Sequence, residues 1–139
     1  MKNITVDEVE KLAHQLAIKQ MSWDEPIPDF GTRFPGRLES CLATVFQTFA
    51  RRDLYPTLVD KAAMLFYLLV KNHPFTNGNK RIAVSSLLVF LALNKKWLAV
   101  TNEEIYEMAV SVAKSSPKLR RGVFELVKDF IDKNLVDFK

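Results

Sequence analysis

Residues 73–81 read His73-Pro74-Phe75-Thr76-Asn77-Gly78-Asn79-Lys80-Arg81, and the rest of the chain is organised around them. They separate two long apolar runs, residues 62–70 and 82–93, and both runs have the composition of buried helices. Proline and glycine interrupt the helical pattern between the runs, so the nine residues form a polar loop. A polar loop between two buried helices is a rigid place for a binding or catalytic site.

Helical periodicity continues on both sides of the loop. A capping-box pattern, Thr5-Val6-Asp7-Glu8, opens a first helix that we expect to end near Met21. Apolar residues recur every three or four positions along this helix and are expected to form one face. They are Val9, Leu12, Ala13, Leu16 and Ala17. The same spacing predicts further helices over residues 38–49, 56–71, 79–93, 102–114 and 119–134.

Two segments break this pattern. Three prolines and a glycine between Trp23 and Pro35 exclude a helix and predict an extended flap or a small hairpin. Residues 98–100 are expected to form a short extended link. The sequence therefore predicts one all-α domain over residues 1–139, a compact helical bundle in which a central buried helix pair flanks the loop and a small extended flap lies outside.

The composition limits the classes of function. The 139 residues are 48% apolar and 26% charged, as in ordinary globular proteins. The net charge of +4 comes from scattered basic residues without a basic, aromatic stripe, so we expect no direct nucleic-acid partner. The longest apolar run is too short to cross a bilayer, and the N-terminus lacks the apolar core of a secretory signal. The single cysteine, Cys41, fits a reducing compartment. We therefore expect a cytoplasmic protein without membrane attachment.

The loop has the chemistry of an anion site. A helix that starts after a glycine-containing turn directs unpaired N–H groups and the positive end of its dipole toward one point, here near Gly78-Asn79-Lys80. Arg81 has a planar fork suited to phosphate oxygens, and Lys80 is a flexible point charge. A neutral imidazole at His73 is suited to take a proton from an attacking hydroxyl.

A structural interpretation of the same residues stays open. In it, His73 ends one helix, Asn79 caps the next, and Lys80-Arg81 is a solvated first turn. Cations at a helix N-terminus are electrostatically unfavourable, so two in succession favour a bound anion.

The nine residues resemble the signature of the Fic/Doc family, His-Pro-Phe-x-Asp/Glu-Gly-Asn-Gly-Arg, in the variant that ends Asn-Lys-Arg. Other segments are similar to the death-on-curing (Doc) branch of that family, and the similarity extends from residue 4 to about residue 130. These segments are Ile4–Val9, Gly36–Ser40, Tyr55–Leu58, Lys61–Ala63, Asn72–Phe75 and Phe90–Asn94.

The resemblance implies a Fic/Doc-type helical bundle and a role for each loop residue. His73 would be the general base, and Phe75 would anchor the loop. Asn79 and Arg81, together with amides around Gly78, would contact the nucleotide phosphates. Pro26–Pro35 would match the flap that aligns the target protein.

Lys80 bears on the reaction, because AMP-transferring relatives have glycine there. In the Doc branch the lysine accompanies transfer of the γ-phosphoryl group of ATP to a threonine of translation elongation factor Tu, which arrests growth. The resemblance therefore implies a toxin that phosphorylates a threonine or serine hydroxyl of a target protein, with ATP and Mg²⁺. Two alternatives remain: AMP transfer to a protein hydroxyl, and a nucleotide-binding or regulatory protein with little catalysis.

Two features concern the metal and the partner. Asn77 occupies the position of the family's Asp or Glu ligand for Mg²⁺, so a weak metal ligand is expected there. The chain also lacks the Ser/Thr-x-x-x-Glu-Gly/Asn signature of the family's self-inhibiting helix. The resemblance thus implies restraint by a separate antitoxin of the Phd type.

For two residues outside the loop, the expected position or role rests on the general behaviour of their residue types. His14 lies beside Leu12 on the first helix, and we expect a surface or boundary position for it. Arg37, near the flap, is expected to be structural, with contact to a target or phosphate as the alternative.

Overall fold

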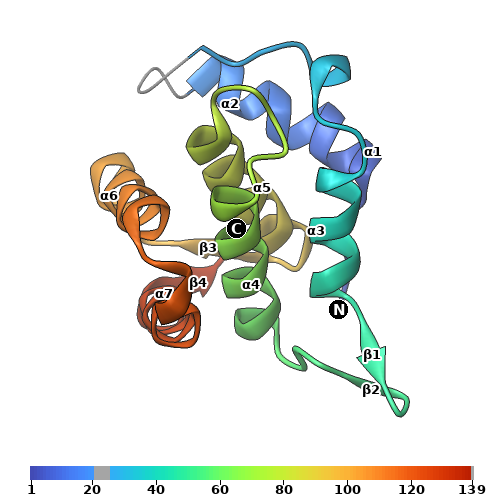
Figure 1. The fold of residues 1–139 in the computed structure, drawn as a ribbon. Coiled ribbons are helices and arrows are strands. Elements are labelled where there is room, and N and C mark those ends of the chain that lie inside the picture. Colours follow the sequence, from blue (N-terminus) through green and yellow to red (C-terminus); the bar gives the residue numbers. More distant parts are fainter. Residues whose placement is uncertain (21–25, 139) are drawn as a thin grey trace.

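A computed structural model describes residues 1–20 and 26–138 (Figure 1). The N-terminal helix consists of α1 (Val6–Glu8), the π-helical segment η1 (Val9–His14) and α2 (Gln15–Gln20). The other helices are α3 (Arg37–Val45), α4 (Leu58–Lys71), α5 (Asn79–Leu93), α6 (Asn102–Lys114) and α7 (Arg120–Asn134), with single 3₁₀ turns at η2 (Phe30–Thr32) and η3 (Pro117–Leu119). The predicted all-α class is confirmed.

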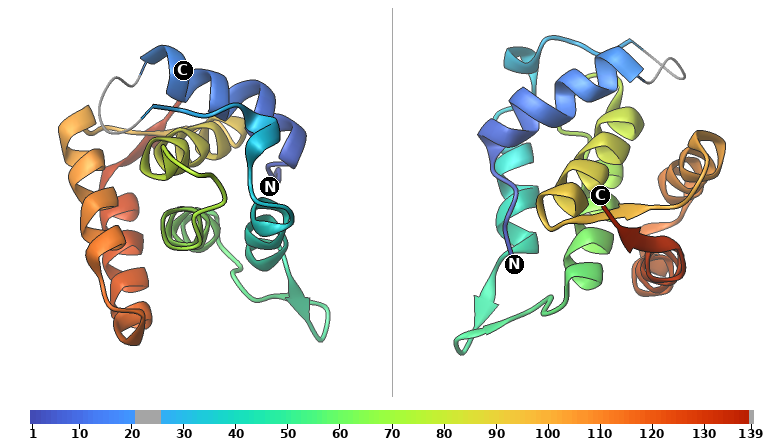
Figure 2. Two further views of the ribbon diagram at one scale, coloured as in Figure 1. Left: turned by 45° about the horizontal axis from the view of Figure 1, so that its top comes forward. Right: turned by 180° about the vertical axis from the view of Figure 1, so that it is seen from behind.

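Helices α4 and α5 form the centre of the fold. Both are buried over most of their length, as their nearly continuous apolar sequences predict. Helix α4 lies between α3 on one side and α6 and α7 on the other (Figure 2). The N-terminal helix packs against α5. The loop between α4 and α5 is therefore carried by two deeply buried helices.

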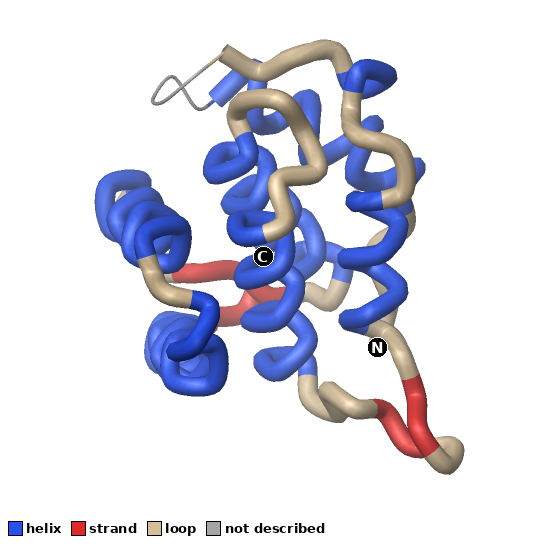
Figure 3. The backbone as a smooth tube through the Cα atoms, viewed as in Figure 1, coloured by secondary structure: helices blue, strands red, loops and turns tan. Residues whose placement is uncertain are grey.

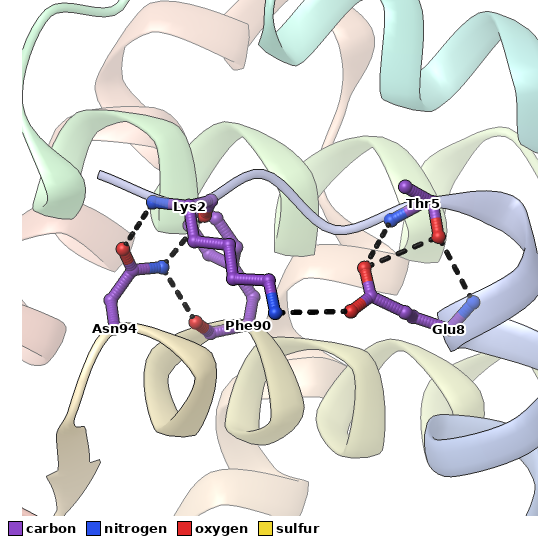
Figure 4. A network of polar contacts seen from close by, with 5 residues as sticks. All are labelled: Lys2, Thr5, Glu8, Phe90 and Asn94. Carbon is purple, nitrogen blue, oxygen red and sulfur yellow. Dashed lines mark hydrogen bonds and ion pairs between the residues drawn. The ribbon is translucent and has the colours of Figure 1, made fainter.

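A polar network fastens the N-terminus to the end of α5 (Figure 4). The Lys2 backbone N–H donates to Asn94 Oδ1 (2.7 Å), and Asn94 Nδ2 donates to the carbonyls of Lys2 (2.8 Å) and Phe90 (3.0 Å). The predicted capping box is present, since the Glu8 N–H donates to Thr5 Oγ1 and the Glu8 carboxylate accepts from the Thr5 N–H. These contacts fix where the first helix starts relative to α5.

Two small antiparallel sheets were not predicted. The first is a hairpin of β1 (Thr48–Phe49) and β2 (Arg52–Asp53). The helix expected over residues 38–49 instead ends at Val45, and Phe49 is 74% exposed. The hairpin turns at Ala50 and Arg51, which both have positive φ. The apolar spacing of the helix continues into the hairpin, and periodicity alone does not reveal that change of direction.

The second sheet pairs β3 (Lys96–Leu98) with β4 (Leu135–Asp137). It includes Leu98, the first residue of the short link expected at residues 98–100, whereas Ala99 and Val100 carry no regular structure. The sheet joins the end of α5 to the end of α7. Of the two forms expected for the flap, the described residues show the extended one rather than the hairpin: residues 26–29 carry no regular structure and lead into η2. The expected end of the first helix at Met21, and Trp23 at the start of the flap, lie outside the described residues. Within the described residues, no helix is both long and apolar enough to cross a membrane.

Asp60 links the start of α4 to α7. Its N–H donates to Thr57 Oγ1 (3.0 Å), its carboxylate accepts from the Thr57 N–H (3.3 Å), and Lys128 Nζ lies 2.8 Å from its Oδ1. Burial raises the pKa of Asp60, but the hydrogen bonds from Lys128 and Thr57 outweigh it and hold the pKa below its ordinary value. A carboxyl group whose pKa is lowered in the folded state stabilises the fold at pH values above its ordinary pKa. This stabilisation is lost as the pH falls through the folded-state pKa.

We therefore expect Asp60→Asn to lower the free energy of unfolding at pH 7 by about 0.5–1 kcal/mol, the usual cost of such an ion pair, because the amide oxygen of asparagine can still accept from the Thr57 N–H. The variant should also lose less stability than the parent on acidification from pH 5 to pH 3. Urea unfolding at the three pH values measures both effects. An equal loss on acidification in parent and variant would contradict this role of the carboxylate.

Candidate functional site

The loop of residues 72–78 joins the end of α4 to the start of α5 and lies beside the flap, residues 26–35 (Figure 3). Two contacts fasten flap and loop together. The Phe34 N–H donates to the Pro74 carbonyl (2.9 Å), and the Ile27 side chain lies over Gly78. The two segments, forty residues apart in sequence, thus form one surface.

Gly78 is the N-cap of α5 and has a left-handed backbone, with φ of +73°. A Cβ atom at this position would lie 2.7 Å from Ile27 Cδ1 and 3.3 Å from the Pro26 carbonyl oxygen. Conformation and space therefore both require glycine. Because glycine has no side chain to cap the helix, no side chain at the N-cap competes with a ligand for the first-turn N–H groups of α5.

Asn79 holds the loop in shape. The Phe75 N–H donates to Asn79 Oδ1 (2.9 Å), and Asn79 Nδ2 donates to the Phe75 carbonyl (2.8 Å). Asn79 is 8% exposed, and Phe75 is fully buried. Both polar atoms of the Asn79 amide therefore hold the loop in this geometry. From the sequence, Asn79 was expected to contact phosphate.

His73 lies at the other end of the loop and is exposed. Its backbone has φ of +47°, an uncommon conformation for a residue with a side chain. The His73 carbonyl accepts from Arg37 Nη1 (3.1 Å), which helps to hold that conformation. His73 Nδ1 lies 3.5 Å from Asn79 Nδ2, at the outer limit for a hydrogen bond. The imidazole is thus close to the first residue of α5.

The Asn79 amide constrains the imidazole. Its nitrogen faces His73, and its oxygen is occupied by the Phe75 N–H, so Asn79 cannot accept a proton from His73 Nδ1. A base that acts through Nε2 needs the proton on Nδ1. In that tautomer His73 Nδ1–H and Asn79 Nδ2 would both be donors, so the imidazole has to turn its Nδ1 away from Asn79 to act as the base.

The two cations of the first turn differ in their surroundings. Arg81 is buried, and its Nη2 donates to the carbonyl of Ala17 (2.8 Å) in the last turn of α2. Arg81 therefore fastens α5 to the end of the N-terminal helix, where carbonyl groups lack helical partners. Lys80 is half-buried, and the first turn of α5 contains no acidic residue. The start of α5 is electropositive.

The donor set does not form a magnesium site. Asn77 is exposed and offers one neutral amide oxygen, and residues 72–81 contain no carboxylate. No group of three or more His, Cys, Asp or Glu side chains in the described part of the chain is placed to hold a metal ion. Hard divalent cations prefer several oxygen ligands, so these residues do not fit a resident Mg²⁺.

A thiol lies behind the loop but is not reactive. Cys41 is buried, and Asn72 Nδ2 lies 3.7 Å from its Sγ. Burial raises the pKa of Cys41, and the contact from Asn72 opposes this only in part. The thiol therefore stays protonated and packs as a small apolar side chain.

Two residues outside the signature help to shape the site. The prediction of a surface or boundary position for His14 was wrong, because the flap covers it and leaves it 4% exposed. The π-helical turn Val9–His14 rotates the buried face, so that Leu12 is 46% exposed instead. Arg37 stacks on Phe34 (4.2 Å to the ring centroid) while it donates to the His73 carbonyl. These contacts agree with the structural role expected for Arg37.

Comparison with known protein families gives a match that includes the loop. The family model described as the Fic/DOC family matches residues 3–91, more than half of the chain and the whole of the loop. The chain belongs to the Fic/Doc family. The Fic/Doc signature therefore corresponds to residues 73–81, which the structure places in the loop after α4 and in the first turn of α5.

Among curated Fic/Doc relatives, a toxin Doc from Mycolicibacterium smegmatis is 41% identical over 64 residues. The aligned part is 46% of this chain and 49% of the relative, so the match spans about half of that protein. This similarity supports the Doc branch of the family. No solved structure matches the chain.

Proposed function

We propose that the chain is a Doc-like toxin that transfers the γ-phosphoryl group of ATP to a serine or threonine hydroxyl of a target protein, with a translation factor such as elongation factor Tu as the target. One observation carries the proposal: an exposed imidazole, His73, lies in the loop that leads directly into the glycine-capped start of α5, with Nδ1 3.5 Å from Asn79 Nδ2. A base next to a phosphate site is the arrangement that transfer to a hydroxyl requires.

In this reaction the protein mainly positions charges. The target hydroxyl gives its proton to His73 Nε2 as its oxygen forms a bond to the γ-phosphorus, and the bond from that phosphorus to the bridging oxygen breaks to release ADP. N–H groups at the start of α5, together with Lys80, stabilise the phosphate oxygens. Arg81 adds positive charge at the same helix end, and Asn79 and Phe75 keep the loop in shape. Any Mg²⁺ would arrive with the nucleotide.

Two alternatives rest on particular residues. AMP transfer would use the same base and the same helix end with the nucleotide reversed, and Lys80 is the residue that disfavours it. A nucleotide-binding or regulatory protein with little catalysis is motivated by Asn77, because the loop lacks a carboxylate for Mg²⁺.

ATP labelled at the α or the γ position separates these alternatives. The chain is incubated with each label and with cell lysate, and His73→Ala serves as the control. Protein labelled only from the γ position supports phosphoryl transfer, and label from the α position supports AMP transfer. Absence of both, together with equal growth arrest by parent and His73→Ala, would contradict both enzymatic functions.

The proposal includes an antitoxin partner of the Phd type. It follows from the similarity to a toxin and from the lack of a self-inhibiting signature in this sequence. We expect co-expression with the product of a small neighbouring gene to restore growth of cells that express the chain. A chain that arrests growth equally with and without that product would contradict this partner.

Asn77→Asp should raise the activity at limiting Mg²⁺. A carboxylate at this exposed position would supply the missing charged oxygen, and we expect the Mg²⁺ concentration for half-maximal rate to fall by about tenfold. Thr76→Asp is the matched control, because it adds the same charge at the neighbouring exposed position. An unchanged magnesium dependence in Asn77→Asp, or an equal change in Thr76→Asp, would show that position 77 is not a ligand.

A further inference from the structure

His14 is a buried histidine that the proposed reaction does not use. It is 4% exposed, and its Nε2 lies 2.8 Å from the Pro28 carbonyl oxygen in the flap. A carbonyl oxygen can only accept, so Nε2 carries the proton and donates it. Nδ1 is buried and has no hydrogen-bond partner among the described residues. The buried imidazole of His14 thus makes one hydrogen bond among the described residues, and its partner lies in the flap.

The imidazole of His14 also packs between two aromatic rings. The Phe30 ring meets it edge-on, with centroids 5.5 Å apart and an interplanar angle of 85°. The Phe75 ring is 6.0 Å away, and Phe30 and Phe75 are 5.7 Å apart. We call these three residues the His14 cluster. They come from the N-terminal helix, the flap and the signature loop, and such ring pairs contribute beyond their buried area.

The cluster is a buried contact beside two other contacts between flap and loop. In these, the Phe34 N–H donates to the Pro74 carbonyl, and the Ile27 side chain lies over Gly78. These contacts join the flap to the loop directly, whereas His14 fastens both of them to the first helix. Removal of its hydrogen bond would leave the Pro28 carbonyl without the donor that now satisfies it.

We propose that His14 is a positioning residue that holds the flap, residues 26–35, against the signature loop and thereby sets how a target segment lies over His73. The fastening of the flap stands on the contacts of His14 alone. Its consequence for the target rests on the proposed function.

Two substitutions separate the parts of this role. His14→Phe keeps a ring of similar shape in the His14 cluster but removes the donor to Pro28. His14→Gln keeps a donor and removes the ring. The matched control is Val112→Ala, which truncates a fully buried side chain in α6 without touching the flap. It shows what a general loss of stability does to the same measurements.

Hydrogen exchange of the whole chain tests the fastening without any activity. The amides of Thr32, Arg33 and Phe34 are hydrogen-bonded within the flap or to the loop. We expect them to exchange about tenfold faster in His14→Phe, the effect of a lost buried hydrogen bond, while protection in α6 and α7 is unchanged. His14→Gln should lie between His14→Phe and the parent. Flap exchange in His14→Phe that equals the parent, or that also appears in Val112→Ala, would overturn the proposal.

Kinetics test the consequence for the target. In His14→Phe the KM for the protein substrate should rise by about tenfold and the KM for ATP by much less, because Lys80 and the first-turn N–H groups of α5 keep their places when the flap loosens. Equal changes in both constants would reduce His14 to a structural role. A parent chain that transfers nothing would refute the proposed function, whereas the exchange result would still decide whether His14 fastens the flap.

Discussion

His73→Ala is expected to slow transfer to the target by about 10²–10⁴-fold, which corresponds to ~3–5 kcal/mol of barrier. The physical reason is the loss of the group that takes the hydroxyl proton. Because the His73 side chain is exposed, its removal leaves the core intact. The initial rate of label transfer from ATP, measured at saturating ATP for parent and variant, gives the factor directly.

The backbone of His73 calls for a second variant as a control. Position 73 has a positive φ, which asparagine tolerates better than alanine does. His73→Asn therefore removes the imidazole with less backbone strain than His73→Ala. We expect His73→Asn to be as slow as His73→Ala, and both variants to unfold at nearly the same urea concentration as the parent. A His73→Asn variant that keeps the parent rate would show that the imidazole is not the base.

Gly78→Ala is expected to have the largest effect on the loop itself. Alanine at a φ of +73° costs about 1–2 kcal/mol, and its Cβ would meet Ile27 and the Pro26 carbonyl. Ile27 can rotate away, but the backbone carbonyl at 3.3 Å cannot do so without moving the flap. We therefore expect a total loss of about 2–3 kcal/mol in the free energy of unfolding, measured with urea.

Gly36 provides a matched control within the same chain. It is also the N-cap of a helix, α3, and has a φ of +80°, but a Cβ atom added there would meet nothing within 4 Å. Gly36→Ala therefore carries the backbone strain without the crowding. The difference between the two variants measures how tightly the flap covers the loop, and Ile27→Ala should recover part of the loss in Gly78→Ala. Equal destabilisation of the two glycine variants would contradict the close approach of the flap.

The sequence was sufficient for the centre of the fold. Helices α4 and α5 follow from two apolar runs, and the loop between them follows from Pro74 and Gly78, because these signals are local. The short strands were not predictable in the same way. Two-residue and three-residue strands such as β1 and β3 exist because of their partners in the folded chain, and their own residues have no period-two pattern.

The sequence predicted which residues belong to the candidate site but not which atoms they contact. Two cations in the first turn of α5 seemed to require an anion, yet the structure gives Arg81 the Ala17 carbonyl as a partner. Likewise, the Asn79 amide is engaged by the Phe75 backbone. Both partners depend on how distant or looped segments meet, which residue spacing does not encode. The helix end, Gly78 and Lys80 therefore favour a bound anion more strongly than Arg81 and Asn79 do.

The proposed function depends most on whether the start of α5 binds the phosphates of ATP. Titration of the isotopically labelled chain with ATP and Mg²⁺, followed by the amide signals of residues 73–81, measures this directly. We predict saturable shifts that are largest at Gly78, Asn79 and Lys80 and that are lost in Gly78→Ala. Signals of the loop that stay in place at millimolar ATP, or shifts confined to another surface, would contradict binding at this helix end.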